Sequence, residues 1–243
     1  MIKIENVETY GWESAIRGMR NPMNSWEKSD SFQCPFENCY YDECPVYKEE
    51  DCDRENEYIV GINDLTLMKK LSWSGNDHGK FLRMINITMD INAPLYWWKE
   101  FDTYKVGTVT NSCSTMHKIH AKEFTLDDFS HEHLTQNAIE LTLKRTIDAL
   151  NEARRCYLNY DEMENGPKAL IHTCGIKNKK DLWWQMIQLL PSSYNQRRTV
   201  QLNYAVLKNI YHARKNHKLD EWHLFCNMIK TLPYAKELII GEE

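Results

Sequence analysis

The sequence predicts an α+β fold, in which a small antiparallel or mixed sheet is combined with a helix-rich C-terminal half. The strand signal is clearest over 85–92, where Ile85, Ile87, Met89 and Ile91 alternate with polar residues. The helix signal is clearest over 134–158, where apolar residues recur every three or four positions. Leu-Pro pairs at 190–191 and 232–233 close two further helical segments, because proline cannot continue a helix.

Length and charge restrict the classes of protein that fit. With 243 residues and 42% hydrophobic content, we expect one domain over 1–243, interrupted by a cysteine-rich insertion at about 32–57. The net charge of −5 comes without a long basic block, which argues against binding to duplex nucleic acid. No apolar run approaches the roughly 18 residues of a membrane span, and the polar N-terminus does not resemble a secretory signal. We therefore expect a cytoplasmic protein that does not bind a membrane.

The first third of the chain predicts a strand and two helices. Ile2 and Ile4 alternate with charged residues, and a helical stretch over 12–19 follows, which Pro22 would end. After the insertion, Asn63 is a suitable N-cap for a helix that Gly75 would stop. His78 lies in the connection that follows.

Four of the eight cysteines crowd into the insertion: Cys34, Cys39, Cys44 and Cys52. Four thiolates could hold zinc or an iron–sulfur cluster, although the spacing C-x4-C-x4-C-x7-C lacks the C-x2-C knuckle typical of such sites. The other interpretation is an acidic surface insertion whose cysteines are reduced and partly buried. Both interpretations remain open on the sequence.

A polar segment follows the clearest strand. Ala93 and Pro94 lead into a helix through about Phe101, since proline is tolerated in the first helical turn. The next stretch, 103–115, has the sequence TYKVGTVTNSCST and shows no apolar periodicity. We expect it to form a loop that wraps a ligand.

Between Leu190 and Arg214, a segment stopped by Pro191 is followed by a stretch that predicts a long amphipathic helix with polar groups on its buried side. Val200, Leu207 and Ile210 fall in line with Asn203 and Arg214 at helical spacing. A buried polar group without a partner costs about 1 to 3 kcal/mol, so we expect these two side chains to meet a protein group or a polar ligand. Arg197 and Arg198 would stand just before the helix, where its dipole favours an anion such as phosphate.

These segments together resemble the flavin-dependent thymidylate synthases. The resemblance covers about 63–243 and follows the order strand, Ala-Pro, helix, polar loop, helix, and a Leu-Pro-led helix bearing an asparagine. The family motif Arg-His-Arg-x-x-Ser-x-Asn-Glu-x-Ser-x-Arg falls on 103–115, with Lys105 for the third arginine and Thr108 for the first serine. Thr103 and Tyr104 replace the leading arginine and histidine.

Two registers of this motif remain open. An ungapped alignment places Asn111 at the glutamate and Cys113 at the second serine. A shift by one residue places Asn111 at the asparagine and Ser114 at that serine. Both registers remove charge, and lysine cannot replace the planar fork with which arginine grips a phosphate.

The C-terminal pattern of the family is matched more closely. Leu190, Pro191, Arg197, Asn203 and Arg214 keep the family spacing. His78 falls where family members carry a histidine beside the flavin, and His223 falls near a nucleotide-binding arginine.

The resemblance implies reductive C5 methylation of dUMP to dTMP, with bound FAD, NADPH as reductant and methylenetetrahydrofolate as carbon donor. It places Lys105, Arg214 and His78 at the flavin, and it implies a homotetramer. The side chains that it places at the nucleotide are Arg197, Asn111, Cys113, Ser114 and His223. It assigns no side-chain nucleophile.

Other interpretations remain open. One is a repurposed or non-catalytic relative that binds a nucleotide or flavin, and another is a flavin enzyme acting on a different pyrimidine. Residue by residue, Asn203 could be a satisfied core asparagine, Arg214 could pair with Asp220 or Glu221, and His78 could be an ordinary loop histidine.

Overall fold

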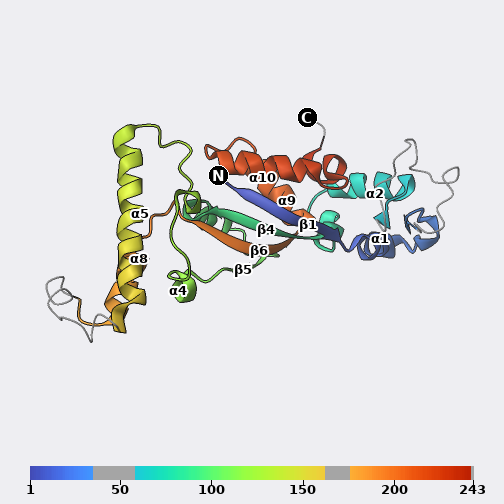
Figure 1. The fold of residues 1–243 in the computed structure, drawn as a ribbon. Helices are drawn as coiled ribbons and strands as arrows, with labels where there is room; N and C mark the ends of the chain where they lie inside the picture. Colours follow the sequence, from blue (N-terminus) through green and yellow to red (C-terminus); the bar gives the residue numbers. More distant parts are fainter. Residues whose placement is uncertain (35–57, 162–175, 242–243) are drawn as a thin grey trace. The chain divides into compact units, whose positions relative to one another are not determined.

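A computed structural model describes residues 1–34, 58–161 and 176–241 of the chain (Figure 1). The described contacts form two compact units. Unit 1 comprises 1–3, 90–103 and 111–199, and unit 2 comprises 4–89, 104–110 and 200–243. The single-domain organisation with an insertion stays a prediction. In the described part of the chain, no helix combines the length and apolar character that a membrane span needs.

The chain has the predicted α+β fold, with many helices and a small antiparallel sheet. The sheet has the strand order β1-β4-β6-β5. Its strands are β1 (Lys3–Tyr10), β4 (Asn86–Pro94), β6 (Asn195–Asn203) and β5 (Val109–Ser112). Each of them contributes residues to both units. A two-stranded antiparallel pair joins β2 (Phe32–Gln33) to β3 (Tyr58–Ile59), with Phe32 opposite Ile59.

Strand β4 confirms the alternation expected from the sequence. Ile87, Met89 and Ile91 are buried, whereas Asn86, Thr88 and Asp90 are partly exposed. Successive side chains of a strand point to opposite faces, so one face of β4 joins the core and the other carries polar groups. Pro94 then caps α3 (Leu95–Phe101), on which Trp97 and Trp98 are buried.

Unit 1 contains the helices α3, α4 (Thr115–Lys118), α5 (Asn137–Leu158) and α8 (Lys179–Leu189), with a short 3-10 turn η6 (Leu126–Asp128). Helices α5 and α8 pack side by side (Figure 1). Leu143, Ile147 and Leu150 of α5 join Met186 of α8 in one apolar cluster. Ile139, four positions before Leu143, is 47% exposed, because it lies in the first turn of α5, beyond that cluster.

Unit 2 contains α1 (Trp12–Arg20), α2 (Ile62–Ser72), α9 (Tyr204–Arg214) and α10 (Asp220–Thr231). Its shorter turns are η1 (Asn21–Met23), η2 (Trp26–Lys28), η5 (Gly79–Arg83) and the π-helix η7 (Lys236–Ile240). The predicted N-cap of α2 was wrong: Asn63 lies inside the helix. Its exposed N–H groups are capped from outside, since the Asp30 carboxylate accepts from the N–H groups of Asn63 and Asp64 at 2.9 and 3.1 Å.

The helix predicted to begin just after Arg198 was wrong in its first turn. Residues 195–203 form β6, and the helix begins only at Tyr204. The run QRRTVQLN alternates polar and apolar residues from Thr199 onward, and in β6 this alternation places Val200 and Leu202 in the core. Asn203 ends the strand and caps α9, where its side chain accepts from the Val206 N–H at 3.1 Å.

Candidate functional site

Arg197 lies on strand β6, where its side chain is about half exposed. Its Nη2 donates to Oδ2 of Asp90 on β4 at 2.8 Å, and the side chains are 49% and 18% exposed. The hydroxyl of Thr199 donates to the other Asp90 oxygen at 2.6 Å. The predicted location of Arg197 and Arg198 just before a helix N-terminus was therefore wrong, because both residues stand on a strand. Anion binding by Arg197 stays a prediction. Arg197 instead presents a cation on the polar side of the sheet, balanced by a carboxylate.

Arg198 takes the opposite role on the same strand. Its guanidinium lies 4.2 Å from the centre of the Trp98 ring and donates to Asp102 at 2.7 Å. Only 13% of its side chain is exposed. Neighbouring strand residues face opposite sides of a sheet. Arg197 is therefore accessible to solvent on one side, whereas Arg198 packs against Trp98 on the other.

The polar tract beside β6 brings several predicted nucleotide residues together. The N–H of Cys113 donates to the Arg197 carbonyl at 2.9 Å, and the Gln196 amide donates to the Cys113 carbonyl at 3.0 Å. Asn111 belongs to β5, all of whose residues are exposed. Ser114 caps α4 and accepts from the His117 N–H at 3.1 Å. Asn111, Cys113 and Ser114 therefore lie on or just after the edge strand β5, beside the inner strand β6 that carries Arg197, although the expected loop is partly strand and helix.

Arg214 anchors a second cluster, in unit 2, which we call the Arg214 cluster and which also contains Tyr104 and Trp222. The Nε of Arg214 donates to the Tyr104 hydroxyl at 2.9 Å. The guanidinium carbon lies 5.0 Å from the Trp222 ring centre and 5.6 Å from that of Tyr104, distances typical of cation–π contacts. Arg214 is thus a partly buried cation held by aromatic rings.

Lys105 and His223 flank this cluster along the chain. Lys105 follows Tyr104 and His223 follows Trp222, and both side chains are exposed. The Nδ1 of His223 lies 3.8 Å from an Asp220 carboxylate oxygen. Lys105 and His223 are therefore sequence neighbours of two members of the Arg214 cluster, in the same unit.

The loop that carries Lys105 is held closely against the start of α9. Gly107 has a φ of +77°, which favours glycine, and a Cβ at this position would lie 2.8 Å from the side-chain nitrogen Nδ2 of Asn203. Thr108 follows, and its hydroxyl is buried and has no hydrogen-bond partner among the residues that the structure describes. A buried hydroxyl without a partner destabilises the folded chain, so a group that formed a hydrogen bond with the Thr108 hydroxyl would be stabilising.

His78 lies at the N-cap of η5 and is exposed. Turn η5 packs against α9, so His78 belongs to the same unit as Arg214. Within the described chain, no hydrogen bond or ion pair joins His78 to Arg214, Tyr104 or Trp222. Its place beside a flavin stays a prediction.

The predicted cysteine site lies mostly outside the described residues. Cys34 is buried with a free thiol, whereas Cys39, Cys44 and Cys52 fall in the segment that is not described. The described residues contain no group of three potential metal ligands. The metal site in the insertion stays a prediction.

Sequence reasoning missed two partners that shape these clusters. In the sequence, Asp90 is only a polar residue of an alternating strand, and Tyr104 only replaces a family histidine. The polar face of 85–92 could have pointed to Asp90, because a carboxylate on a sheet face commonly pairs with a cation on the next strand. The Tyr104–Arg214 bond joins residues 110 positions apart, which no local pattern reveals.

No known protein-family profile matches the chain, and none of the curated proteins matches it in sequence. In contrast, its fold is that of the flavin-dependent thymidylate synthases. A crystal structure of the enzyme from Helicobacter pylori in complex with FAD and dUMP superposes with a TM-score of 0.60 at 14% identity, covering 98% of this chain and 97% of that chain. A second structure of the Helicobacter pylori enzyme with FAD and dUMP gives a TM-score of 0.58 at the same identity and coverage.

Proposed function

We propose that the chain is a divergent flavin-dependent thymidylate synthase that binds FAD and dUMP and methylates the uracil ring at C5. The observation that supports this most strongly is the likeness in fold, over almost the whole of both chains, to an enzyme solved with FAD and dUMP. The co-substrates would be methylenetetrahydrofolate and NADPH. The further parts of the proposal are a single domain, a homotetramer and a cytoplasmic location, with no membrane and no duplex nucleic acid as partner.

In this proposal, Arg197 binds the nucleotide phosphate. Its exposed guanidinium on β6, with Asn111, Cys113 and Ser114 on or just after the adjacent strand β5, offers one cation beside several hydrogen-bonding groups. Such a set suits a phosphate and a pyrimidine ring, because phosphate needs a charged donor and the ring needs neutral donors and acceptors. His223 is a further nucleotide-binding candidate.

The flavin would be held by Arg214 of the Arg214 cluster together with Lys105 and His78 of the same unit. Lys105 and Arg214 supply two cations for an anionic cofactor, and His78 a further polar contact. The unpartnered Thr108 hydroxyl of the described chain supports a polar ligand at this loop, since a ligand could supply its missing bond. When bound, FAD supplies the hydride chemistry, so the side chains need only orient the substrate, stabilise charge and exclude water.

A second candidate function is nucleotide or flavin binding without methylation, or action on a different pyrimidine. The Arg197–Asp90 pair favours it, because a phosphate must compete with a carboxylate 2.8 Å away. The uncharged Thr103 and Tyr104, in place of the arginine and histidine of the family motif, favour it as well.

The first experiment is the absorbance of the purified protein between about 350 and 500 nm, with and without added FAD, since the oxidised isoalloxazine ring absorbs there. Bound flavin supports both functions. A colourless protein that takes up no FAD contradicts the flavin enzyme. Turnover is then followed as release of tritium from C5-labelled dUMP with methylenetetrahydrofolate and NADPH. Flavin binding without tritium release, in a folded protein, favours the second function.

The second experiment measures dUMP affinity in Arg197→Gln. Loss of a charge-assisted phosphate contact should weaken binding by about 1.5 to 3 kcal/mol. The matched control is Arg145→Gln, which removes an exposed arginine on α5 and should leave the dissociation constant unchanged. Equal affinity in wild type and Arg197→Gln would contradict the assigned role.

A further inference from the structure

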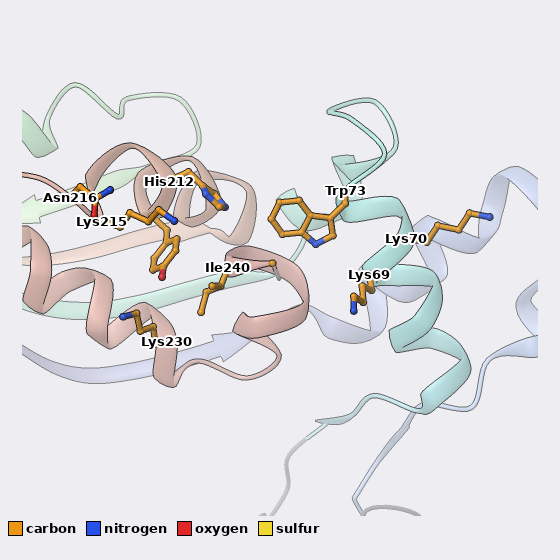
Figure 2. A pocket seen from close by; sticks show the side chains of 10 residues that line it. Lys69, Lys70, Trp73, His212, Lys215, Asn216, Lys230 and Ile240 are labelled. Carbon is orange, nitrogen blue, oxygen red and sulfur yellow. The ribbon is translucent and has the colours of Figure 1, made fainter. Parts of the chain in front are cut away.

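Unit 2 contains a pocket of about 900 Å³ that the proposed function does not use (Figure 2). It lies among helix α2, the C-terminal end of α9, the end of α10 and the π-helix η7. Its volume is in the range of small-molecule sites, which is roughly 300 to 1,000 Å³. The residues that line it are Lys69, Lys70, Trp73, Tyr211, His212, Lys215, Asn216, Lys230, Ile240 and Gly241.

The charge of this lining has one sign. Lys69 and Lys70 come from α2, Lys215 from the C-cap of α9 and Lys230 from the last turn of α10. His212 adds an imidazole to these four lysines, and the ten lining residues include no Asp or Glu. A concave surface lined by one sign of charge focuses the field and raises the local concentration of counter-ions. The pocket therefore attracts anions although the chain as a whole is acidic.

The wall of the pocket is fixed by specific contacts. The indole N–H of Trp73 donates to the Glu237 carbonyl at 2.9 Å, and Lys208 Nζ lies 3.4 Å from the centre of the ring. The His212 ring meets Trp73 edge to face at 5.8 Å and contacts the Ile239 carbonyl through Nε2 at 2.9 Å. Gly241 closes against the same indole, since a Cβ there would lie 2.8 Å from the ring. Because these contacts hold the Trp73 ring in place, Trp73 forms a wall of the pocket. Binding of an anion then depends on the lysines that line the pocket.

The pocket differs from the Arg214 cluster. Arg214 and Lys215 are adjacent, but the Arg214 guanidinium contacts Tyr104 and Trp222, neither of which lines the pocket. Lys215 Nζ lies 5.8 Å from the ring of Tyr211, which does line it. At the end of α9, the Arg214 side chain therefore belongs to the Arg214 cluster, whereas the Lys215 side chain lines the pocket.

We propose that this pocket binds a small molecule carrying a diphosphate or triphosphate group, at a site separate from the proposed flavin and nucleotide sites. Several lysines from different elements suit such a ligand, because lysine is a compact point charge that can reach any phosphate oxygen. A single phosphate meets fewer of these cations than a chain of two or three. The lining therefore selects for the number of adjacent phosphates.

Isothermal titration calorimetry with inorganic pyrophosphate tests this site, with orthophosphate as the ligand of lower charge. We expect saturable pyrophosphate binding, about tenfold or more tighter than that of orthophosphate and weakening as salt is raised from about 50 to 200 mM. Lys69→Gln/Lys230→Gln, which removes one cation from each of two walls, should weaken pyrophosphate binding by about tenfold or more. The matched control, Lys80→Gln/Lys218→Gln, removes two exposed lysines of the same unit outside the pocket and should change it by less than about twofold.

Two more titrations distinguish the pocket from the nucleotide site and from a nucleic-acid surface. Arg197→Gln should keep full pyrophosphate affinity, and its loss would place the anion at the nucleotide site instead. A short single-stranded oligonucleotide should bind more weakly than pyrophosphate; tighter binding with the same sensitivity to Lys69 and Lys230 would overturn the small-molecule assignment. Absence of pyrophosphate heat up to about 5 mM, a range that covers weak specific affinities, or equal losses in both double variants, would overturn the site itself. Failure here leaves the flavin experiments unaffected, since they use different residues.

Discussion

Two arginine–aspartate pairs in this chain have nearly the same geometry and opposite surroundings. Arg20 and Asp64, in unit 2, lie 2.6 Å apart with side chains 5% and 0% exposed. Arg197 and Asp90, in unit 1, lie 2.8 Å apart with side chains 49% and 18% exposed. The buried Asp64 also accepts from the hydroxyls of Ser29 and Ser31, each at 2.6 Å. Arg20 in turn donates to two backbone carbonyls.

The difference in exposure decides in which pair the arginine can leave its aspartate and bind another anion. The hydrogen bonds that hold Arg20 and Asp64 end on protein groups, so removing one member leaves a buried charge that nothing else neutralises. The exposed pair can be separated at little cost, because water and an incoming anion both replace the lost contact. The first pair therefore serves stability, and the second is the one suited to a ligand.

The largest effect is expected for Asp64→Asn. The variant leaves the Arg20 guanidinium buried without a carboxylate, and the free energy of unfolding should fall by about 3 to 5 kcal/mol. Urea denaturation followed by circular dichroism measures it. A loss below about 1 kcal/mol, the value of an exposed pair, would remove the distinction between the two pairs.

The pH dependence of unfolding tests the same Arg20–Asp64 pair. Burial alone would raise the pKa of Asp64, but hydrogen bonds from Ser29, Ser31 and Arg20, with the charge of Arg20, outweigh it and lower the pKa below its ordinary value of 3.8. The ionised form is therefore favoured by folding. This contribution is complete above about pH 4 and is lost as the pH falls further, so Asp64→Asn should unfold in acid with a smaller pH dependence than wild type.

Lys208 extends the comparison to a partly buried cation held by neutral groups. Its Nζ donates to the carbonyl and hydroxyl of Ser72 at 2.6 and 3.0 Å. Burial lowers the pKa of Lys208 from 10.5 to about 8. The folded chain thus releases this proton before the unfolded chain does, and the free energy of unfolding should rise by about 2 to 3 kcal/mol as the pH rises from 8 to 10.5.

Lys208→Met provides the control for that pH dependence. Burial raises the pKa of Cys226 to about 11, which acts in the opposite direction above pH 9 in both proteins. The difference between wild type and variant therefore isolates Lys208. Parallel stability curves from about pH 7.5 to 10.5 would show that Lys208 keeps its ordinary pKa.

Arg214 lies between the two pairs in burial and should lie between them in effect. Arg214→Leu removes the bond to the Tyr104 hydroxyl and the cation–π contact with Trp222, so stability should fall by about 1 to 2 kcal/mol. FAD affinity should fall as well if the proposed site is correct. Tyr104→Phe is the matched variant, since it removes only the hydrogen bond; a loss equal to that of Arg214→Leu would assign the whole effect to that bond.

These clusters also show what the sequence could and could not predict. Local patterns were sufficient for β4 and α3, because strict alternation and a helix-starting proline are local signals. They failed at 200–203, where residues with acceptable helical spacing form the end of strand β6, because β4 and β5 pair with that strand on both sides. The same failure misplaced the surroundings of Arg197. Its partner Asp90 lies 107 positions away, so only the strand order could have revealed the pair.

The smallest effect on stability, and the most direct test of the comparison, is expected for Asp90→Asn. An exposed ion pair contributes about 0 to 1 kcal/mol, so the unfolding transition should barely move. Affinity for dUMP should instead rise by about three- to tenfold, because the phosphate no longer competes with a carboxylate for Arg197. Asp148→Asn, an exposed change on α5 with the same charge difference, controls for overall charge. If Asp90→Asn weakens dUMP binding, Asp90 holds Arg197 in its binding orientation, and the exposed pair is then part of the site and not a competitor for it.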